Sequence, residues 1–256
     1  MREYKLHYQK NIRDLGGLIG YQGKKVKFGR IFRGGFLDRV APEDVPILES
    51  FKLTDIVDFR GKEEFENRPD YVLKGVTYHN FPVIQEKVNK EDLHNEDGNL
   101  LWFIKDNRPG HDHMMEVYQE TVTTPRGIEA YKNFFKVLLE DNRVTYFHCS
   151  QGKDRAGIAA FLIEMALGVD LEVAKEDYLR SNLAMEHRVE MLIEQVKNKP
   201  FYDEKYKKSM YDVFSAKIEY LEATIAIINE KYGSILDYLK NVLEVDIDRL
   251  RKLYLE

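Results

Sequence analysis

Cysteine is almost absent from this chain, which has a single one among 256 residues. One cysteine cannot form an internal disulfide, and this is typical of a protein from a reducing compartment. The segment 1–10 lacks the apolar stretch of a secretory signal, and no other apolar run is long enough to cross a bilayer. We therefore expect a cytoplasmic protein without a transmembrane segment, with export by another route left open.

The chain also lacks an excess of positive charge and any recognisable linker. Its formal net charge is −5 at pH 7, so it has no electrostatic reason to bind nucleic acid. No stretch is rich in proline, glycine or serine, and no internal repeat is evident. With 43% hydrophobic residues the sequence is typical of a globular protein. We expect one domain over residues 1–256, and the sequence leaves its oligomeric state undetermined.

The order of the predicted elements indicates an α/β fold. Apolar and β-branched runs predict strands at 53–59, 76–83 and 144–148, and helical spacing predicts helices at 42–51, 127–140 and 158–167. The stretch 18–34 is expected to form a hairpin or short strands, and 85–125 lacks strong periodicity. After Gly168 the pattern is helical, at 172–181, 186–197, 204–230, 235–243 and 246–255. This order predicts a short central sheet flanked by helices, with a long helical C-terminal part.

Residues able to carry out chemistry are concentrated in the segment 148–157, His-Cys-Ser-Gln-Gly-Lys-Asp-Arg-Ala-Gly. It lies between a predicted strand and a predicted helix, where backbone N–H groups and the helix dipole together form an anion site. Gly152 permits a tight turn, and Cys149 would lie in the same positive field, which favours the nucleophilic thiolate. Arg155 can return to face Cys149 and bind two phosphoryl oxygens.

A lone cysteine is more often a buried structural residue than a nucleophile. Here the cysteine coincides with an arginine six positions later, with two glycines and with a strand–turn–helix frame. This coincidence favours a nucleophilic cysteine that acts on a phosphoryl group.

The segment resembles the His-Cys-x5-Arg signature of protein tyrosine phosphatases, matched here by His148, Cys149 and Arg155. More narrowly, it is similar to bacterial tyrosine and lipid phosphatases with a Gly-Lys-Asp-Arg loop, here residues 152–155. Other stretches that resemble this branch are 11–17 (Asn-Ile-Arg-Asp-Leu-Gly-Gly), 32–35, 58–60, 177–182 and 230–234. The resemblance implies an N-terminal motif and hairpin in 1–35, a catalytic core in 53–168, and a helical extension in 169–256 that could act as a lid.

The resemblance also implies a phosphocysteine intermediate, no metal or other cofactor, and a general acid. Related enzymes carry that acid on a separate Trp-Pro-Asp loop, but the only tryptophan here, Trp102, has no such context. The implied acid is therefore Asp154. The position of Asp58 at a predicted strand end makes it the alternative acid and Arg60 a further secondary residue. The loop residues expected to bind substrate are Ser150, Gln151, Gly152, Lys153 and Ala156.

Two positions of the loop bear on substrate and turnover. Loops with a lysine at the position of Lys153 are associated with phosphoinositides as well as phosphotyrosine; the alternative is a solvent-facing lysine. The family usually has Ser or Thr where this chain has Ala156, and the missing hydroxyl is expected to slow hydrolysis of the phosphoenzyme. Phosphotyrosine, phosphoserine, phosphothreonine and phosphoinositides all fit the loop. The rival functions are a catalytically silent phospho-binding module, sulfur transfer or arsenate reduction.

Three weaker signals remain. The pattern His111-Asp112-His113 suggests a metal ligand pair, although a solvated loop is the better interpretation without a third ligand. For Arg13 and Asp14 we favour an ion pair that pins the N-terminal segment over contact with substrate. The aromatic stretch 201–214 is expected to pack helix on helix, and a lid over the pocket is the alternative.

Overall fold

A six-stranded mixed sheet forms the centre of the computed structural model, which describes residues 2–84, 109–200 and 202–256. The strand order is β1-β2-β3-β6-β4-β5; β3, β6, β4 and β5 run parallel, and β1 and β2 pair antiparallel at one edge. The strands are β1 (Arg2–Tyr4), β2 (Ile12–Asp14), β3 (Ile31–Gly35), β4 (Asp55–Asp58), β5 (Thr77–Asn80) and β6 (Thr145–Cys149).

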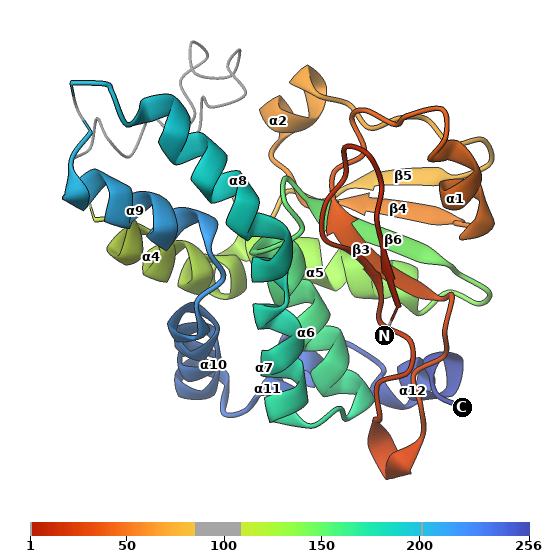
Figure 1. Ribbon diagram of the computed structural model, residues 1–256. Coiled ribbons are helices and arrows are strands. Elements are labelled where there is room, and N and C mark those ends of the chain that lie inside the picture. The colour runs from red at the N-terminus through yellow and green to blue at the C-terminus, as the bar shows by residue number, and fades with distance from the viewer. Residues whose placement is uncertain (1, 85–108, 201) are drawn as a thin grey trace.

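Helices cover both faces of the sheet and make up the C-terminal part (Figure 1). They are α1 (Val45–Ser50), α2 (Lys62–Asn67), α4 (Gly110–Thr123), α5 (Pro125–Leu138), α6 (Arg155–Leu167), α7 (Leu171–Leu179), α8 (Ser181–Val196), α9 (Glu204–Phe214), α10 (Ile218–Tyr232), α11 (Ile235–Asp237), η3 (Tyr238–Val242) and α12 (Ile247–Tyr254); η1 (Tyr21–Gly23) is a short turn. Capping residues set the ends of several helices. Thr124 caps α5 ahead of Pro125, and Gly168, with φ of 76°, ends α6 in the left-handed region.

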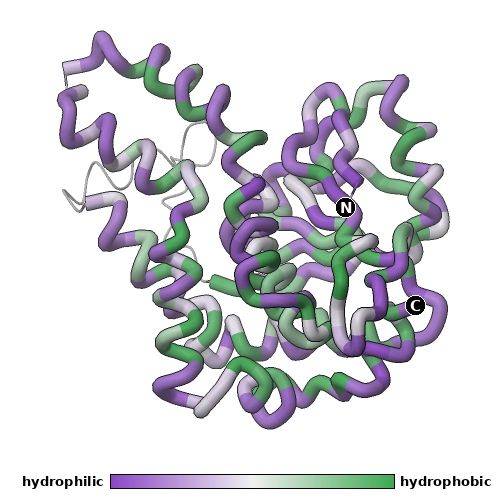
Figure 2. The backbone as a smooth tube through the Cα atoms, turned by 60° about the horizontal axis from the view of Figure 1, so that its bottom comes forward, coloured by the Kyte–Doolittle hydropathy of each residue, from purple (hydrophilic) through white to green (hydrophobic). Residues whose placement is uncertain are grey.

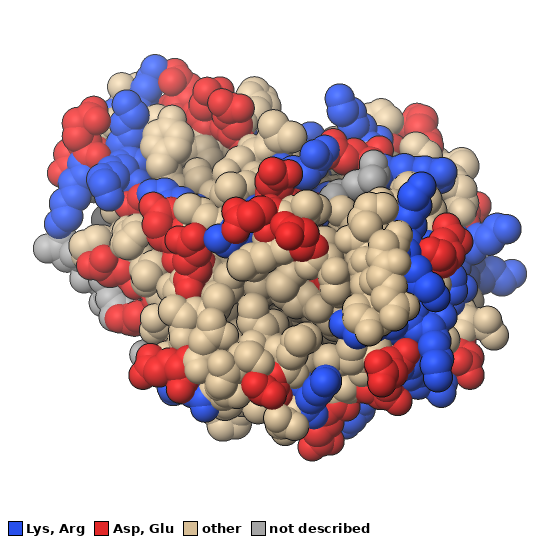
Figure 3. Space-filling model, turned by 90° about the horizontal axis from the view of Figure 1, so that it is seen from below, with Lys and Arg blue, Asp and Glu red and all other residues tan. Residues whose placement is uncertain are grey.

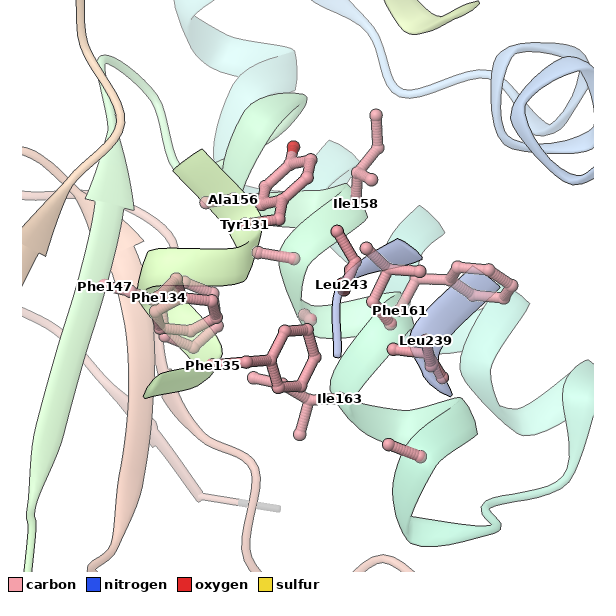
Figure 4. Packing of buried hydrophobic residues seen from close by; sticks show 14 of the residues in the cluster. Tyr131, Phe134, Phe135, Phe147, Ala156, Ile158, Phe161, Ile163, Leu239 and Leu243 are labelled. Carbon is pink, nitrogen blue, oxygen red and sulfur yellow. The ribbon is translucent and has the colours of Figure 1, made fainter. Parts of the chain in front are cut away.

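Side chains of the parallel strands alternate between two apolar cores. Phe147 and Val57 face the larger core with α5 and α6, whereas their neighbours Tyr146 and Ile56 face a smaller core beside α1. This period of two follows from the pleat of a strand, and coverage on both faces explains why these strands are apolar throughout. Figure 4 shows Phe134 of α5 beside Phe147 in the larger core, with the ring centroids 4.9 Å apart and the rings tilted by 55°.

The structure confirms the three expected strands and most of the expected helices, and it corrects the expected elements at two places. The part of 85–125 that is described contains α4, a regular helix from Gly110. The helix expected over 204–230 is two helices, because the backbone is extended at Ser215 and Lys217. Asn182 holds this break open by bonding both the N–H and the C=O of Ala216, at 2.7 and 2.9 Å.

Helices α8 and α9 pair with each other and stand away from the sheet (Figures 1 and 2). Leu192 of α8 packs in a small separate cluster with Tyr206, Met210 and Phe214 of α9. The aromatic stretch thus packs helix on helix through Tyr206 and Phe214, whereas Tyr211 is exposed; Phe201 at its start lies outside the described residues.

Charges of both signs surround an uncharged central area on the face seen from below in Figure 3. Helices α10, α11 and α12 lie at this end of the molecule (Figure 1). Of the helices in the described ranges, none is long and apolar enough to cross a membrane.

A buried ion-pair network joins the N-terminal strands to α7. Arg13 of β2 and Arg33 of β3 both donate to the Asp177 carboxylate, at 2.9 Å each. Burial alone would raise the pKa of Asp177, but the two arginines outweigh it and hold that pKa below its usual value. Glu164 of α6 lies next to Asp177, and burial together with that carboxylate raises the pKa of Glu164 well above its usual value. The network therefore holds Glu164 as a neutral acid over a wider pH range than the unfolded chain does.

We predict that Glu164→Gln removes a pH dependence from stability. Above pH 4.5, the ordinary value for Glu, the unfolded chain loses a proton that folded Glu164 keeps, so wild-type stability falls as pH rises. The difference between variant and wild type should therefore grow with pH, by at most about 1.4 kcal/mol per pH unit. Urea unfolding at several pH values from about 5 to 8 measures it. Glu129→Gln, at an exposed position of α5, is the control, and parallel curves for wild type and Glu164→Gln would contradict the prediction.

Candidate active site

The segment from Cys149 to Arg155, here called the cysteine loop, leaves β6 at the carboxyl edge of the parallel strands and enters α6. Gly152 has a φ of 67°, and a Cβ at this position would lie 2.2 Å from the carbonyl of Gly34. Only glycine meets both demands, the left-handed backbone and the close approach to β3. The glycine predicted to make the turn is thus required by the fold of the loop.

Carbonyl groups of the loop are held on its outer side. The Asn11 Nδ2 group donates to the carbonyl oxygens of Gly152 and Gln151 at 3.0 and 3.4 Å, and Arg33 donates to Gly152 O at 2.9 Å. A trans peptide points its N–H opposite to its C=O, so the N–H groups of Gly152 and Lys153 face the inner side. Inward N–H groups beside the first turn of a helix are the arrangement that anions favour, so the loop is a candidate anion site.

Cys149 and Arg155 occupy the two ends of this loop. Cys149 is 2% exposed and is the free cysteine of the chain. The Arg155 guanidinium bonds the Glu64 carboxylate of α2 at 2.8 Å and the Ser150 hydroxyl at 2.9 Å. Ser150 in turn donates to Glu64 at 2.5 Å. Glu64 is a residue that the sequence analysis did not single out, and it holds the guanidinium at the mouth of the loop.

Asp154 lies at the N-cap of α6 with its side chain 25% exposed. Its Oδ1 accepts from the Tyr118 hydroxyl of α4 at 2.5 Å and from the Lys153 ammonium at 2.6 Å. Tyr118 is in turn 2.7 Å from the hydroxyl of Tyr178 in α7. Neither tyrosine was expected from the sequence, although Tyr178 belongs to the quoted stretch 177–182.

Lys153 is buried, at 1% exposed, so the solvent-facing alternative is wrong. Besides Asp154, its ammonium donates to the carbonyl oxygens of Val213 and Ser215, at 3.0 and 3.2 Å. An ammonium has three N–H donors, and these three contacts use all of them. Lys153 thus ties the cysteine loop to the break between α9 and α10.

Asp58 and Arg60 belong to a buried network beneath the loop. Arg60 donates to both oxygens of Asp58 at 2.7 to 3.0 Å and to Asp70 at 3.3 Å. His148 lies 2.8 Å from Asp70. Burial would lower the pKa of His148, but the Asp70 and Asp58 carboxylates outweigh it, and the net pKa is raised.

The same three residues, Asp58, Asp70 and His148, are close enough to suit a metal ion. The Arg60 guanidinium already supplies a positive charge to both carboxylates, so the cluster is explained without an ion. Arg60 thus donates to both oxygens of Asp58, whereas the side chain of Asp154 is partly exposed.

The remaining candidate residues are Ala156 in the loop and the pair His111 and Asp112. Ala156 is fully buried against the larger core, and Tyr131 beside it donates to the carbonyl of Arg155 at 2.9 Å (Figure 4). His111 and Asp112 lie in the first turn of α4 at 3.4 Å from each other, with His111 also against Tyr220. The expected solvated loop is therefore a helix start, and Trp102 lies outside the described residues.

Arg13 and Asp14 both have structural roles, with partners other than each other. Arg13 pairs with Asp177, whereas Asp14 accepts from the backbone N–H groups of Gly16 and Gly29 at 2.8 and 2.7 Å. The N-terminal motif is thus pinned, as favoured, but by contacts with α7 and with its own turns.

A model of the tyrosine phosphatase family matches residues 4–256. The chain belongs to the tyrosine phosphatase family. A protein of Cupriavidus necator, provisionally named a tyrosine-protein phosphatase, is 29% identical over 249 residues, which cover 96% of this chain and 85% of that one. The triple specificity protein phosphatase PtpB of Mycobacterium tuberculosis is 27% identical over 276 residues, covering 95% and 99%.

Among solved structures, that of P. aeruginosa TpbA in complex with phosphotyrosine covers 80% of this chain and 90% of that chain, with 13% identity and a TM-score of 0.29. Membership of the tyrosine phosphatase family confirms the family resemblance and the expected α/β fold class. It also makes the chain a phosphatase that acts on a phosphorylated substrate.

We predict that Glu64→Gln lowers phosphatase activity. Glu64 and Arg155 are each 10% exposed, and loss of the carboxylate charge frees the guanidinium to leave the mouth of the loop. A hydrogen bond between charged groups contributes about 1.5–3 kcal/mol, so kcat/KM should fall roughly tenfold to hundredfold. Steady-state kinetics measures this, with Glu63→Gln at the exposed neighbouring position as the control. Higher kcat/KM together with tighter inhibition by inorganic phosphate would instead mean that Glu64 competes with the substrate.

Proposed function

We propose that this phosphatase hydrolyses phosphotyrosine in proteins through a phosphocysteine intermediate. The observation that carries the proposal is the cysteine loop, with Cys149 at its start, inward N–H groups along it and Arg155 at its end. A phosphoryl group presents three oxygens to such donors, and the negative charge on those oxygens is what the loop is built to stabilise.

In the first step the Cys149 thiolate attacks phosphorus, and the bond from phosphorus to the tyrosyl oxygen breaks. Asp154, in its protonated form, transfers a proton to that oxygen so that tyrosine leaves as a neutral phenol. Arg155 and the loop N–H groups hold the equatorial oxygens during the transfer. The products of this step are tyrosine and the S-phosphocysteine form of Cys149.

In the second step water attacks the phosphocysteine and the sulfur–phosphorus bond breaks. The Asp154 carboxylate accepts a proton from the water, so both the acid and the Cys149 thiolate are regenerated and phosphate is released. Because Ala156 offers no hydroxyl to the departing thiolate, we expect this step to be slower than with Ser or Thr at that position.

The proposed acid is Asp154 rather than Asp58. Asp154 is partly exposed and belongs to the loop itself, whereas Asp58 is buried and bonded by Arg60 on both oxygens. A carboxyl that serves as acid and then as base needs access to the leaving group and to water. Only Asp154 offers that access.

The proposed substrate is phosphotyrosine rather than a phosphoinositide. A second phosphate on an inositol ring would need another cation beside the loop, and Lys153 already donates to three protein oxygens. Because one relative is named a triple specificity protein phosphatase, the test also includes phosphoserine peptides and phosphoinositides.

The mechanism predicts distinct losses in two variants. Cys149→Ser should abolish phosphate release from every substrate, because the nucleophile is lost. Asp154→Asn should lower kcat on phosphotyrosine peptides by about 10²–10³-fold, and less on 4-nitrophenyl phosphate, whose leaving group needs little protonation. Phosphate release without metal, measured on phosphotyrosine and phosphoserine peptides and on phosphoinositides, tests both. Phosphopeptide binding without turnover by wild type would instead favour a silent binding module.

Lys153→Met tests the substrate class. Because the ammonium bridges Asp154 and two backbone carbonyls, its loss should lower the free energy of unfolding by about 2 kcal/mol. Activity on phosphotyrosine and on phosphoinositides should fall by a similar factor. Lys74→Met, at an exposed position, is the control for urea unfolding and kinetics. Selective loss of phosphoinositide hydrolysis would show that Lys153 binds a second phosphate.

A further inference from the structure

We propose that Tyr118 is a positioning residue that fixes which oxygen of Asp154 carries the catalytic proton. The proposal rests on the role proposed above for Asp154 as the general acid. It concerns a buried side chain of α4 that lies 36 positions before the acid in sequence and does not belong to the cysteine loop.

Both donors on the acid converge on one oxygen. The Tyr118 hydroxyl and the Lys153 ammonium donate to Asp154 Oδ1, at 2.5 and 2.6 Å. An oxygen that accepts two hydrogen bonds is the carbonyl-like oxygen of a carboxylic acid, since its lone pairs are engaged. The proton is therefore carried by Oδ2, and its direction toward the leaving group is set by the contacts on Oδ1.

The direction of donation in this chain of hydroxyls follows from proton counting. Tyr118 has one hydroxyl proton, and the carboxylate can only accept it when ionised. The 2.7 Å contact between Tyr118 and Tyr178 is therefore donated by Tyr178. Burial, with the nearby Asp154 charge, raises the pKa of both tyrosines well above the usual value, so both keep their protons.

The Asp154 carboxylate is not used as a helix cap. Aspartate at an N-cap often accepts from a backbone N–H two or three residues on; Asp170, Asp203 and Asp246 do so at α7, α9 and α12, whereas Asp44 at α1 does not. Asp154, at the N-cap of α6, has a helical backbone like that of Asp44 and makes no such bond. The Asp154 carboxylate instead accepts from Tyr118 and Lys153. The first N–H groups of α6 are therefore not bonded by this carboxylate and can face the anion site.

Tyr178 connects the arrangement to the scaffold of the loop. It follows Asp177, whose carboxylate holds Arg13 and Arg33. One turn of α7 thus supports both the outer side of the cysteine loop and the hydroxyl that orients Tyr118. Tyr178 thus links the orientation of Asp154, through Tyr118, to the helix that also supports the cysteine loop.

The decisive experiment is a double-mutant cycle between Tyr118→Phe and Asp154→Asn, in the full chain, on a phosphotyrosine peptide and on 4-nitrophenyl phosphate. Tyr118→Phe alone should lower kcat on the peptide about tenfold, a part of the general-acid effect, with a smaller loss on 4-nitrophenyl phosphate and little change in KM. In the Asp154→Asn background the same change should alter kcat less than about twofold. Tyr254→Phe, which removes a buried hydroxyl that bonds Leu138 O far from the loop, is the control.

Each alternative outcome has one meaning. An equal loss from Tyr118→Phe in both backgrounds, or none in the wild-type background, would overturn the positioning role and leave Asp154 as the acid. Full peptide activity in Asp154→Asn would overturn the acid and the present proposal together. Loss of all activity only in Cys149→Ser would still support the phosphocysteine pathway. If Tyr118→Phe does not fold, Tyr178→Phe should give the same pattern with a smaller loss.

Discussion

The buried carboxylate of Asp177 is the contact on which the geometry of the site depends. The buried guanidinium groups of Arg13 and Arg33 share it, and another N–H group of Arg33 donates to the carbonyl of Gly152. Burial and the neighbouring Arg13 lower the pKa of Arg33 to about 10, so it remains charged near neutral pH. Buried ion pairs add little net stability, and replacement by apolar residues is often neutral. Here the network has a use besides stability, since it turns the loop carbonyls outward and leaves the N–H groups inward.

The helical C-terminal part is joined to the same loop by Lys153. Its ammonium reaches carbonyl oxygens at both sides of Phe214, where α9 ends. The carbonyls at a helix C-terminus carry partial negative charge and lack partners within the helix, which makes them suitable for a buried cation. The interruption of the expected 204–230 helix therefore serves the loop, because an unbroken helix would have kept these carbonyls for itself.

How much the sequence could reveal follows from how far apart the contacting residues lie. The strands, the anion-binding turn and the places of Cys149 and Arg155 follow from local patterns within a few residues of each other. The partners of the loop do not. Glu64 precedes Arg155 by 91 positions and Asn11 precedes Gly152 by 141, and such pairs form only when the sheet brings the segments together. The 204–230 break was missed for the same reason, since the Asn182 side chain that bonds Ala216 at the break comes from α8.

Under the proposed mechanism, placing the acid inside the cysteine loop changes what the fold must supply. An acid on a separate loop can be positioned by closure of that loop over the substrate. Asp154 instead belongs to the cysteine loop itself, so the direction of its carboxyl group has to be fixed by contacts that exist before the substrate binds. The Asp154 carboxylate makes no bond to the α6 backbone, so its direction depends on the side chains that donate to it. Two donors on one oxygen supply that direction: Tyr118 from α4, outside the cysteine loop, and Lys153 from within the loop, which Val213 of α9 holds in turn.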